Sequence, residues 1–346
     1  MYTEIKRYIR NLALMTIPFW CFLGIYAILD PFRVIWHYDD YFTSRKVHIS
    51  LNHFNVSATN FDHLYDTEKW NSYIIGTSRS RYWEVKDWTK YLPQGSNAYH
   101  FEHSGGSSYS LMKTFEYLDE KGAKLENVLM ILDARLLGFK EPSYSHTSYT
   151  APQMEHYRDI LNYHLTSFKA YCDFDFLCTY YEELFFPHNN PDVRELSNGE
   201  FFSYEPRNNQ IYQNVIENKI SKGEYYTKEY VNYMFHEGSQ YPDSVSPPVI
   251  LETQKCQLNI IKNILVKHQT DCRIVISPLY PQIKFNPEDL RFLQDLFGKN
   301  NVYDYSGVNN ITNDYHNYYE NSHYRPCVTR KIMDEIYNNK TILSTF

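Results

Sequence analysis

The sequence predicts an α/β fold built on a parallel sheet, carried by one membrane-spanning helix at the N-terminus. Two observations lead to this prediction. Short, continuous apolar runs alternate with segments of helical periodicity, which is typical of parallel strands buried on both faces. Ahead of them, residues 12–29 form an 18-residue stretch without a charged side chain. A stretch of that length is close to the minimum that a helix needs to span a bilayer.

The charges around residues 12–29 predict an orientation in the membrane. Three basic residues precede the stretch: Lys6, Arg7 and Arg10. The acidic Asp30 follows it. The positive-inside rule then places residues 1–11 in the cytoplasm and the C-terminal domain outside the inner or plasma membrane. A cleaved signal peptide and a buried core helix are the alternatives. The stretch is longer than a usual signal-peptide core and no A-x-A site follows it, which favours an uncleaved anchor.

The α/β domain is expected over residues 70–346, and a connector precedes it. Residues 30–69 are mixed and aromatic, and we expect this connector to lie near the membrane. Strands are predicted by the apolar runs at residues 72–76 (SYIIG) and 127–133 (NVLMILD), with a poorer strand at 97–103. A helix is predicted over residues 108–121. Its stripe of Leu111, Phe115 and Leu118 has helical spacing, and Gly122 is its stop.

The last third of the sequence repeats the alternation of strands and helices. The expected elements are helices over residues 249–268, 287–297 and 328–338 and strands over residues 273–277 and 301–305. Pro278 stops the first of these strands, while Pro287 and Gly298 mark the two ends of the middle helix. A sheet of about five parallel strands with helices on both faces is therefore expected.

Residues 141–247 interrupt this pattern. They are rich in Tyr, His, Asn and Pro, with helices expected around residues 154–165 and 177–186. We interpret this region as a helical insertion that covers or borders the functional site.

Composition limits the classes of partner. The net charge is −7 and no large basic block occurs, which argues against nucleic acid. The six cysteines show no CxxC and no zinc spacing. We expect no metal and no other cofactor. Tyrosine is frequent, with 34 residues. Tyrosine-rich surfaces suit wet recognition grooves, including those for sugars, although genome composition explains the same count.

Three segments carry side chains that suit catalysis. In residues 74–80 (IIGTSRS), Ser78 follows a strand at a sharp turn, where open α/β folds place ligands. In residues 103–108 (HSGGSS), Gly105 and Gly106 allow the backbone to approach a ligand closely. Taken alone, the first segment also fits an ordinary helix cap and the second a plain turn.

The third segment lies just before the last helix. Glu320 and His323 are three residues apart in a polar run. In a loop, that spacing lets the carboxylate orient the imidazole, and a base held by an acid is what a serine nucleophile requires. An exposed polar loop is the alternative interpretation.

The chain order of these segments resembles that of the SGNH/GDSL hydrolase superfamily: a Ser after the first strand, a Gly pair after the second, and acid-x-x-His before the last helix. The superfamily includes membrane-anchored relatives of cell-envelope acylation systems, the DltD-like and AlgX/AlgJ-like proteins. The resemblance covers roughly residues 70–140 and 248–340, and residues 303–307 (YDYSG) look like a run in these anchored relatives. It implies a flavodoxin-like, three-layer α/β fold.

The resemblance also implies roles for single residues. Ser78 corresponds to the nucleophile, His323 to the base, and Glu320 to the acid that is usually Asp. The backbone N–H groups of Ser78 and of Gly105 or Gly106 correspond to the oxyanion hole. Each such donor typically supplies about 3–4 kcal/mol of transition-state stabilisation.

The sequence departs from the family pattern at two positions. Thr77 stands where the name-giving motif has Asp, and the third strand ends in Asp133 where the family usually has an Asn donor. An ionised carboxylate cannot donate a hydrogen bond, so Asp133 would be protonated or play a different part. Alternatively, Arg79, Arg81 or Arg135 would offset the developing negative charge.

These observations predict acyl transfer or ester hydrolysis on a cell-surface glycan or similar envelope polymer. The resemblance implies a surface polysaccharide as acceptor, and a membrane-bound O-acyltransferase as partner. The alternative is a non-catalytic, glycan-binding or scaffold subunit of an envelope assembly. A secreted esterase of short soluble esters is a third interpretation.

Overall fold

The structure, a computed structural model, describes residues 2–42, 47, 49–141, 143–186, 203–235 and 244–338. The chain divides into two compact units. The first comprises Met1–Leu51 with Leu161–Gly199 and contains the N-terminal helix. The second comprises Asn52–Ile160 with Glu200–Phe346 and contains the main sheet.

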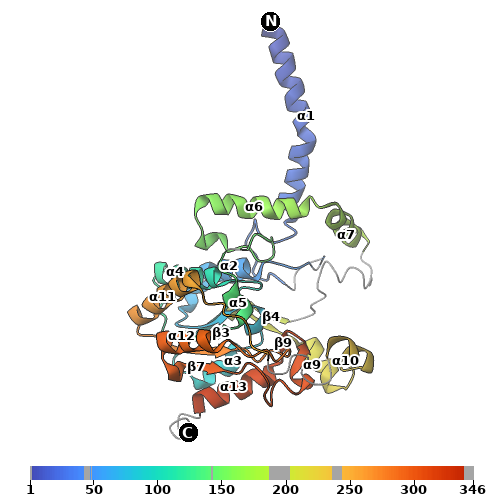
Figure 1. Ribbon diagram of the computed structural model, residues 1–346. Coiled ribbons are helices and arrows are strands. Elements are labelled where there is room, and N and C mark those ends of the chain that lie inside the picture. The colour runs from blue at the N-terminus through green and yellow to red at the C-terminus, as the bar shows by residue number, and fades with distance from the viewer. Residues whose placement is uncertain are drawn as a thin grey trace. The chain divides into compact units, whose positions relative to one another are not determined.

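Five parallel strands form the main sheet of the second unit (Figure 1). The strands are β1 (Ser72–Gly76), β2 (Ala98–Glu102), β3 (Asn127–Leu132), β6 (Asp271–Ile276) and β7 (Val302–Asp304). Their order, β2-β1-β3-β6-β7, is the 2-1-3-4-5 order of doubly wound sheets such as that of flavodoxin. The predicted α/β class and the parallel sheet are confirmed.

Helices cover both faces of this sheet, so the second unit has three layers. The core on one face contains side chains of α2 (His53–Glu68), α4 (Ser108–Glu120), α11 (Glu252–Lys267) and α12 (Pro287–Phe297), and the core on the other contains those of α3 (Val85–Trp88) and α13 (Pro326–Asn338). Along β1, Tyr73 and Ile75 join the first core and Ile74 joins the second. Burial on both faces explains why the strands read as continuous apolar runs.

Helix α2 lies in the segment that the sequence predicted to be a connector. Asn52 caps its start, since its side chain accepts the N–H groups of Phe54 and Asn55, both at 3.1 Å. Phe54 and Phe61 are buried in the core beside the sheet. The unit with the sheet therefore begins at Asn52, whereas the domain was expected from residue 70. Buried polar side chains interrupt the apolar stripe of α2, which hid its periodicity.

The predicted insertion, residues 141–247, contains two helices near the expected positions, α6 (Tyr157–Tyr171) and α7 (Phe174–Phe185). It also contains the hairpin of β4 (Ser203–Glu205) and β5 (Gln210–Tyr212), and the helices α9 (Asn214–Ser221) and α10 (Lys228–Met234). Residues 142, 187–202 and 236–243 lie outside the described part of the chain. Residues 161–199 belong to the first unit and later residues to the second, so the insertion does not fold as one segment.

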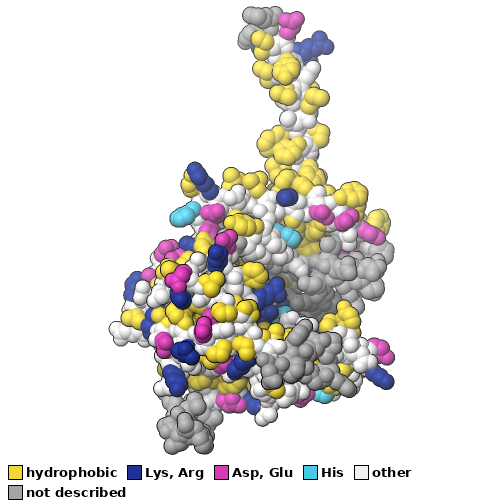
Figure 2. Space-filling model, in the orientation of Figure 1, with side chains coloured by type: hydrophobic (Ala, Val, Ile, Leu, Met, Phe, Trp, Pro, Cys, Tyr) yellow, Lys and Arg dark blue, Asp and Glu magenta, His cyan; other side chains and the backbone are white. Residues whose placement is uncertain are grey.

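The first unit contains α1 (Tyr2–Leu29), which is long and apolar enough to cross a membrane. Figure 2 shows hydrophobic side chains exposed along it. Near its end, the rings of Phe22 and Tyr26 contact Tyr171 of α6, with centroids 5.1 and 4.8 Å apart. Just beyond, the Asp30 carboxylate accepts the N–H groups of residues 34–36 at 2.9–3.1 Å. The end of α1 is thus packed and hydrogen-bonded within the first unit.

Candidate active site

Ser78 begins the short 3-10 helix η1 (Ser78–Ser80), directly after β1 at the carboxyl end of the sheet. The chain turns sharply there because Gly76 has no side chain: a Cβ would lie 2.9 Å from both the Ile131 carbonyl oxygen and the Ser80 Cβ. The Ser80 hydroxyl fixes the turn, donating to the Thr77 carbonyl at 2.8 Å. The side chain of Ser78 is left partly exposed.

The predicted acid–base pair forms on a hairpin of β8 (Tyr318–Glu320) and β9 (His323–Tyr324). His323 Nδ1 is hydrogen-bonded to Glu320 Oε1, and Glu320 Oε2 accepts the Ser322 N–H at 2.8 Å. Burial raises the pKa of Glu320, but the hydrogen bond and charge of His323 outweigh it and hold that pKa below its usual range. The carboxylate therefore orients the ring.

The second nitrogen of His323 is available for chemistry. Nε2 is buried and has no hydrogen-bond partner among the described residues. With Nδ1 hydrogen-bonded to Glu320, the neutral ring carries its proton there and presents a lone pair at Nε2. That is the arrangement in which an imidazole accepts a proton from a nucleophile.

The structure brings the hairpin beside η1, although these segments lie far apart in the sequence. Cα atoms of β9 and η1 approach within 8 Å. The ring of Tyr82 lies 6.3 Å from that of His323, and Trp83 Nε1 donates to the Tyr324 hydroxyl at 2.9 Å. The hydroxyl of Ser78 forms no hydrogen bond with the described residues, His323 included. Catalytic hydrogen bonds are often long in unliganded enzymes and shorten when substrate binds.

The two glycines differ in what their N–H groups do. The Gly106 N–H donates to the His103 carbonyl at 2.8 Å, so it is engaged in a turn. A Cβ on Gly106 would lie 2.0 Å from His103 Nδ1, so this position requires glycine for packing alone. Gly105 has a φ of +69°, and in the described part of the chain neither its N–H nor that of Ser78 is hydrogen-bonded. These two are the remaining candidates for the oxyanion hole.

Asp133 acts as a helix cap and a counter-ion. Its Oδ1 accepts the N–H groups of Arg135 and Leu136 at 2.8 and 3.0 Å, which starts the helix α5 (Ala134–Gly138). Its Oδ2 lies 3.4 Å from Arg79 Nε, and both side chains are nearly buried. Both contacts use the carboxylate as an acceptor or an anion. They favour a role for Asp133 other than hydrogen-bond donation, and they hold the guanidinium of Arg79, the residue after Ser78, at the carboxyl end of the sheet.

A buried charge network that the sequence did not predict lies behind η1. Glu102, at the end of β2, accepts Arg81 Nε and Nη2 at 3.2 and 3.1 Å and pairs with His53 Nδ1 at 2.9 Å. Burial would raise the pKa of Glu102, but the charges of Arg81 and His53 hold it well below its usual range. Arg81 directly follows η1, so this network holds the turn that carries Ser78 against β2. An acidic residue at the end of a fully buried strand was the available signal.

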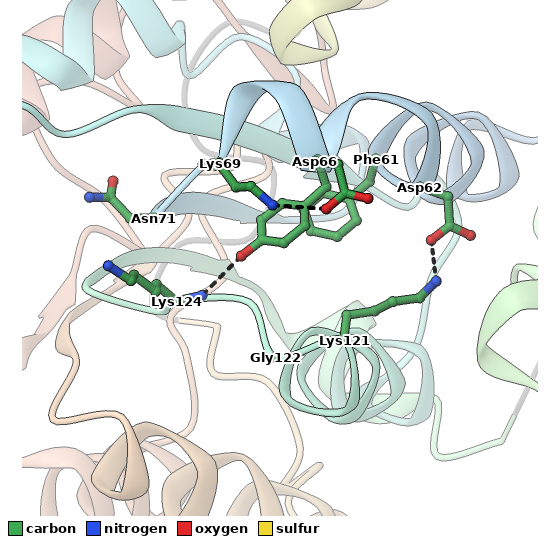
Figure 3. Close-up of a pocket in the computed structure, with 9 residues that line it drawn as sticks. Phe61, Asp62, Asp66, Lys69, Asn71, Lys121, Gly122 and Lys124 are labelled. Atoms are coloured by element: carbon green, nitrogen blue, oxygen red, sulfur yellow. Dashed lines mark hydrogen bonds and ion pairs between the residues drawn. The ribbon is translucent and has the colours of Figure 1, made fainter.

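A pocket of about 550 Å³ lies at the opposite, amino-terminal edge of the sheet (Figure 3). Two of its three lysines pair with its own acids: Lys69 with Asp66 at 2.8 Å, and Lys121 with Asp62 at 2.5 Å. No serine, cysteine or histidine is among the residues that line it. The pocket therefore lacks a nucleophile and base of the kind found at the carboxyl edge.

No protein-family model matches this chain, and no curated protein matches it.

Proposed function

We propose that the protein is a serine-dependent acyl-transfer enzyme of the SGNH type. The observation that carries the proposal is the Glu320–His323 pair. His323 Nε2 is buried and has no hydrogen-bond partner among the described residues, and the strand that contains His323 packs beside the helix that Ser78 begins. A carboxylate, an imidazole and a serine hydroxyl in this order are the components of a nucleophilic triad.

In the proposed reaction, the Ser78 hydroxyl attacks the carbonyl carbon of an acyl ester while His323 Nε2 takes its proton. Collapse of the tetrahedral intermediate breaks the bond to the alcohol, which leaves with that proton, and the acyl group stays on Ser78. A sugar hydroxyl or water then attacks the acyl-enzyme, and the same proton transfers return the free serine. The N–H groups of Ser78 and Gly105 would hold the oxyanion, with Arg79 supplying positive charge.

We infer that the substrate is a cell-surface polysaccharide or another envelope polymer, with a membrane-bound O-acyltransferase as partner. This substrate class rests on the resemblance to anchored SGNH proteins and is an analogy. Support for an uncleaved anchor is structural. A cleaved signal peptide would remove Tyr26, which is 4% exposed, and with it the ring contact to Tyr171.

The test is labelling of the full-length protein in detergent with a fluorophosphonate probe. Labelling of the wild type and of Ser322→Ala, but not of Ser78→Ala or His323→Ala, is the expected result. Ser322 is the nearby serine control: its backbone N–H, which alanine keeps, donates to Glu320 Oε2 at 2.8 Å, and its hydroxyl donates to Asn321 Oδ1 at 3.0 Å. Glu320→Gln should slow labelling by about 10²–10⁴-fold, because the amide no longer stabilises the imidazolium. Absence of labelling in a folded wild type would refute an activated serine.

A non-catalytic glycan-binding subunit is the second candidate. It is favoured by the engaged N–H of Gly106 and by the absence of a formed bond from Ser78 to His323 among the described residues. This candidate predicts glycan binding that is unchanged in Ser78→Ala and no probe labelling. If labelling occurs, dependence of turnover on a polymer acceptor separates a transferase from an esterase of soluble substrates.

A further inference from the structure

Helix α6 presents an exposed apolar stripe in the first unit. Leu161 is 60% exposed and Leu165 53%, Phe168 is partly exposed, and Cys172 is exposed just after the helix ends. The intervals of four, three and four residues place all of them on one face of a helix. The face formed by residues 163, 167 and 171 is buried. The exposed stripe is therefore a second apolar face, in addition to the one that α6 uses for packing.

Helix α7 repeats the pattern. Phe174 is 76% exposed and Phe185 67%, with Cys178 exposed and Tyr181 partly exposed between them, again at intervals of four, three and four. Phe176 and Tyr180 face inward. Two successive helices with this feature exceed what is normal for a surface in water, where large apolar patches mark contacts with a protein or a membrane.

The contacts between α1 and α6 show how far along α1 the helix α6 lies. Figure 1 shows α6 running crosswise to α1 near the end of α1. Phe168 and Tyr171 of α6 contact Phe22 and Tyr26, which are seven and three residues before Leu29. At a rise of about 1.5 Å per residue, these contacts lie roughly 5–10 Å along the helix axis on the N-terminal side of Leu29, where the apolar run ends. Helices that lie in a membrane interface are buried to the same depth, about 5–10 Å.

We propose that α6, from Leu161 onward, and α7 lie in the outer interface of the bilayer that α1 crosses, with their exposed stripes against lipid. Lipid is the occupant because the α6 stripe continues the apolar surface of α1 at the level where that helix leaves the hydrocarbon. Helix α7 is held next to α6, since its inward Phe176 contacts Tyr171 of α6 and Phe32, with centroids 6.4 and 5.0 Å apart. The exposed Lys169 lies beside the α6 stripe, where its stem covers apolar surface and its ammonium reaches a lipid phosphate. The proposal rests on α1 spanning the membrane and does not depend on the catalytic function.

The test places single fluorophores on the full-length protein in phosphatidylcholine vesicles. All six cysteines are free, so a variant without them is the background for returning one cysteine at a time. The matched pair is Leu161→Cys and Asn162→Cys, two exposed neighbours on α6 that differ in the face they occupy. Each is labelled with NBD and quenched either by doxyl lipids or by aqueous cobalt. Cys21 in α1 and Cys256 in α11 are the lipid and water references.

The expected result is quenching by doxyl lipid that is several-fold stronger at position 161 than at 162, with the reverse order for cobalt. Equal quenching of the two positions would overturn the proposal. A blue-shifted fluorophore at 161 that neither quencher reaches would also overturn it, because the stripe would then be covered by protein. If lipid fails to quench even at Cys21, α1 does not span the bilayer and the premise fails.

Discussion

Acidification should destabilise the second unit through two buried histidines at the end of β2. Burial lowers the pKa of His100 and of His103 from 6.5 to about 4. The charge of Arg81 also lowers the pKa of His100, and His100 lowers the pKa of His103. The charge of Glu102 acts in the opposite direction on both histidines. Both side chains are neutral in the folded protein near neutral pH, whereas both take up protons near pH 6.5 when the chain unfolds.

The unfolded state therefore binds more protons than the folded state between about pH 6.5 and pH 4, and stability falls as the pH falls through that window. For a shift from 6.5 to about 4, each histidine removes about 2 kcal/mol of unfolding free energy between pH 7 and pH 5. The loss from both is about 4 kcal/mol.

The assay is chemical denaturation in detergent at several pH values, followed by the fluorescence of the buried Trp83 and Trp88. His103→Gln should lose about 2 kcal/mol of the change between pH 7 and pH 5 because one group no longer titrates, while Ser110 keeps a polar partner for its hydroxyl. An equal pH dependence in wild type and variant would refute the reasoning, because the protons would then be taken up elsewhere.

Two further predictions concern stability. Gly106→Ala should cost about 3 kcal/mol by overpacking against His103, while Gly122→Ala, which has a φ of +67° and open space, should cost only about 1–2 kcal/mol; denaturation curves that reverse this order would contradict the packing argument. Arg79→Met should cost about 3 kcal/mol because Asp133 is left buried without its counter-ion, and adding Asp133→Asn, which keeps the helix cap, should recover part of the loss. A double-mutant cycle that shows no coupling would mean that this ion pair contributes nothing.

The fold was predictable where local chemistry determines the structure. Asn286 and Pro287 were expected to open α12, and the Asn286 side chain does accept the N–H groups of Glu288 and Asp289 at 2.9 and 3.3 Å. The start of α11 was not predictable in this way. Helix was expected from residue 249, but the N–H of Val249 donates to the Asp289 carboxylate at 2.7 Å, which holds the segment extended. The partner is distant in sequence, so no local pattern reveals it.

The candidate site was likewise predictable only where its residues are close in sequence. Glu320 and His323 are three residues apart, and the structure joins them as the spacing predicted. The choice between Gly105 and Gly106 required the turn geometry, because only the structure shows which N–H is engaged. The network of Glu102 unites side chains from three separate segments, and such a meeting depends on the complete fold.

The hairpin that carries His323 and Glu320 has a consequence for biosynthesis. Glu320 and His323 are three residues apart and can pair as soon as that short stretch exists, whereas Ser78 is translated long before them. Until the hairpin packs beside η1, a nascent chain would carry an ordinary, unreactive hydroxyl at position 78. Under the proposed mechanism, the late arrival of His323 would leave Ser78 of the emerging polypeptide unacylated, and activity would appear only once the hairpin has packed beside η1.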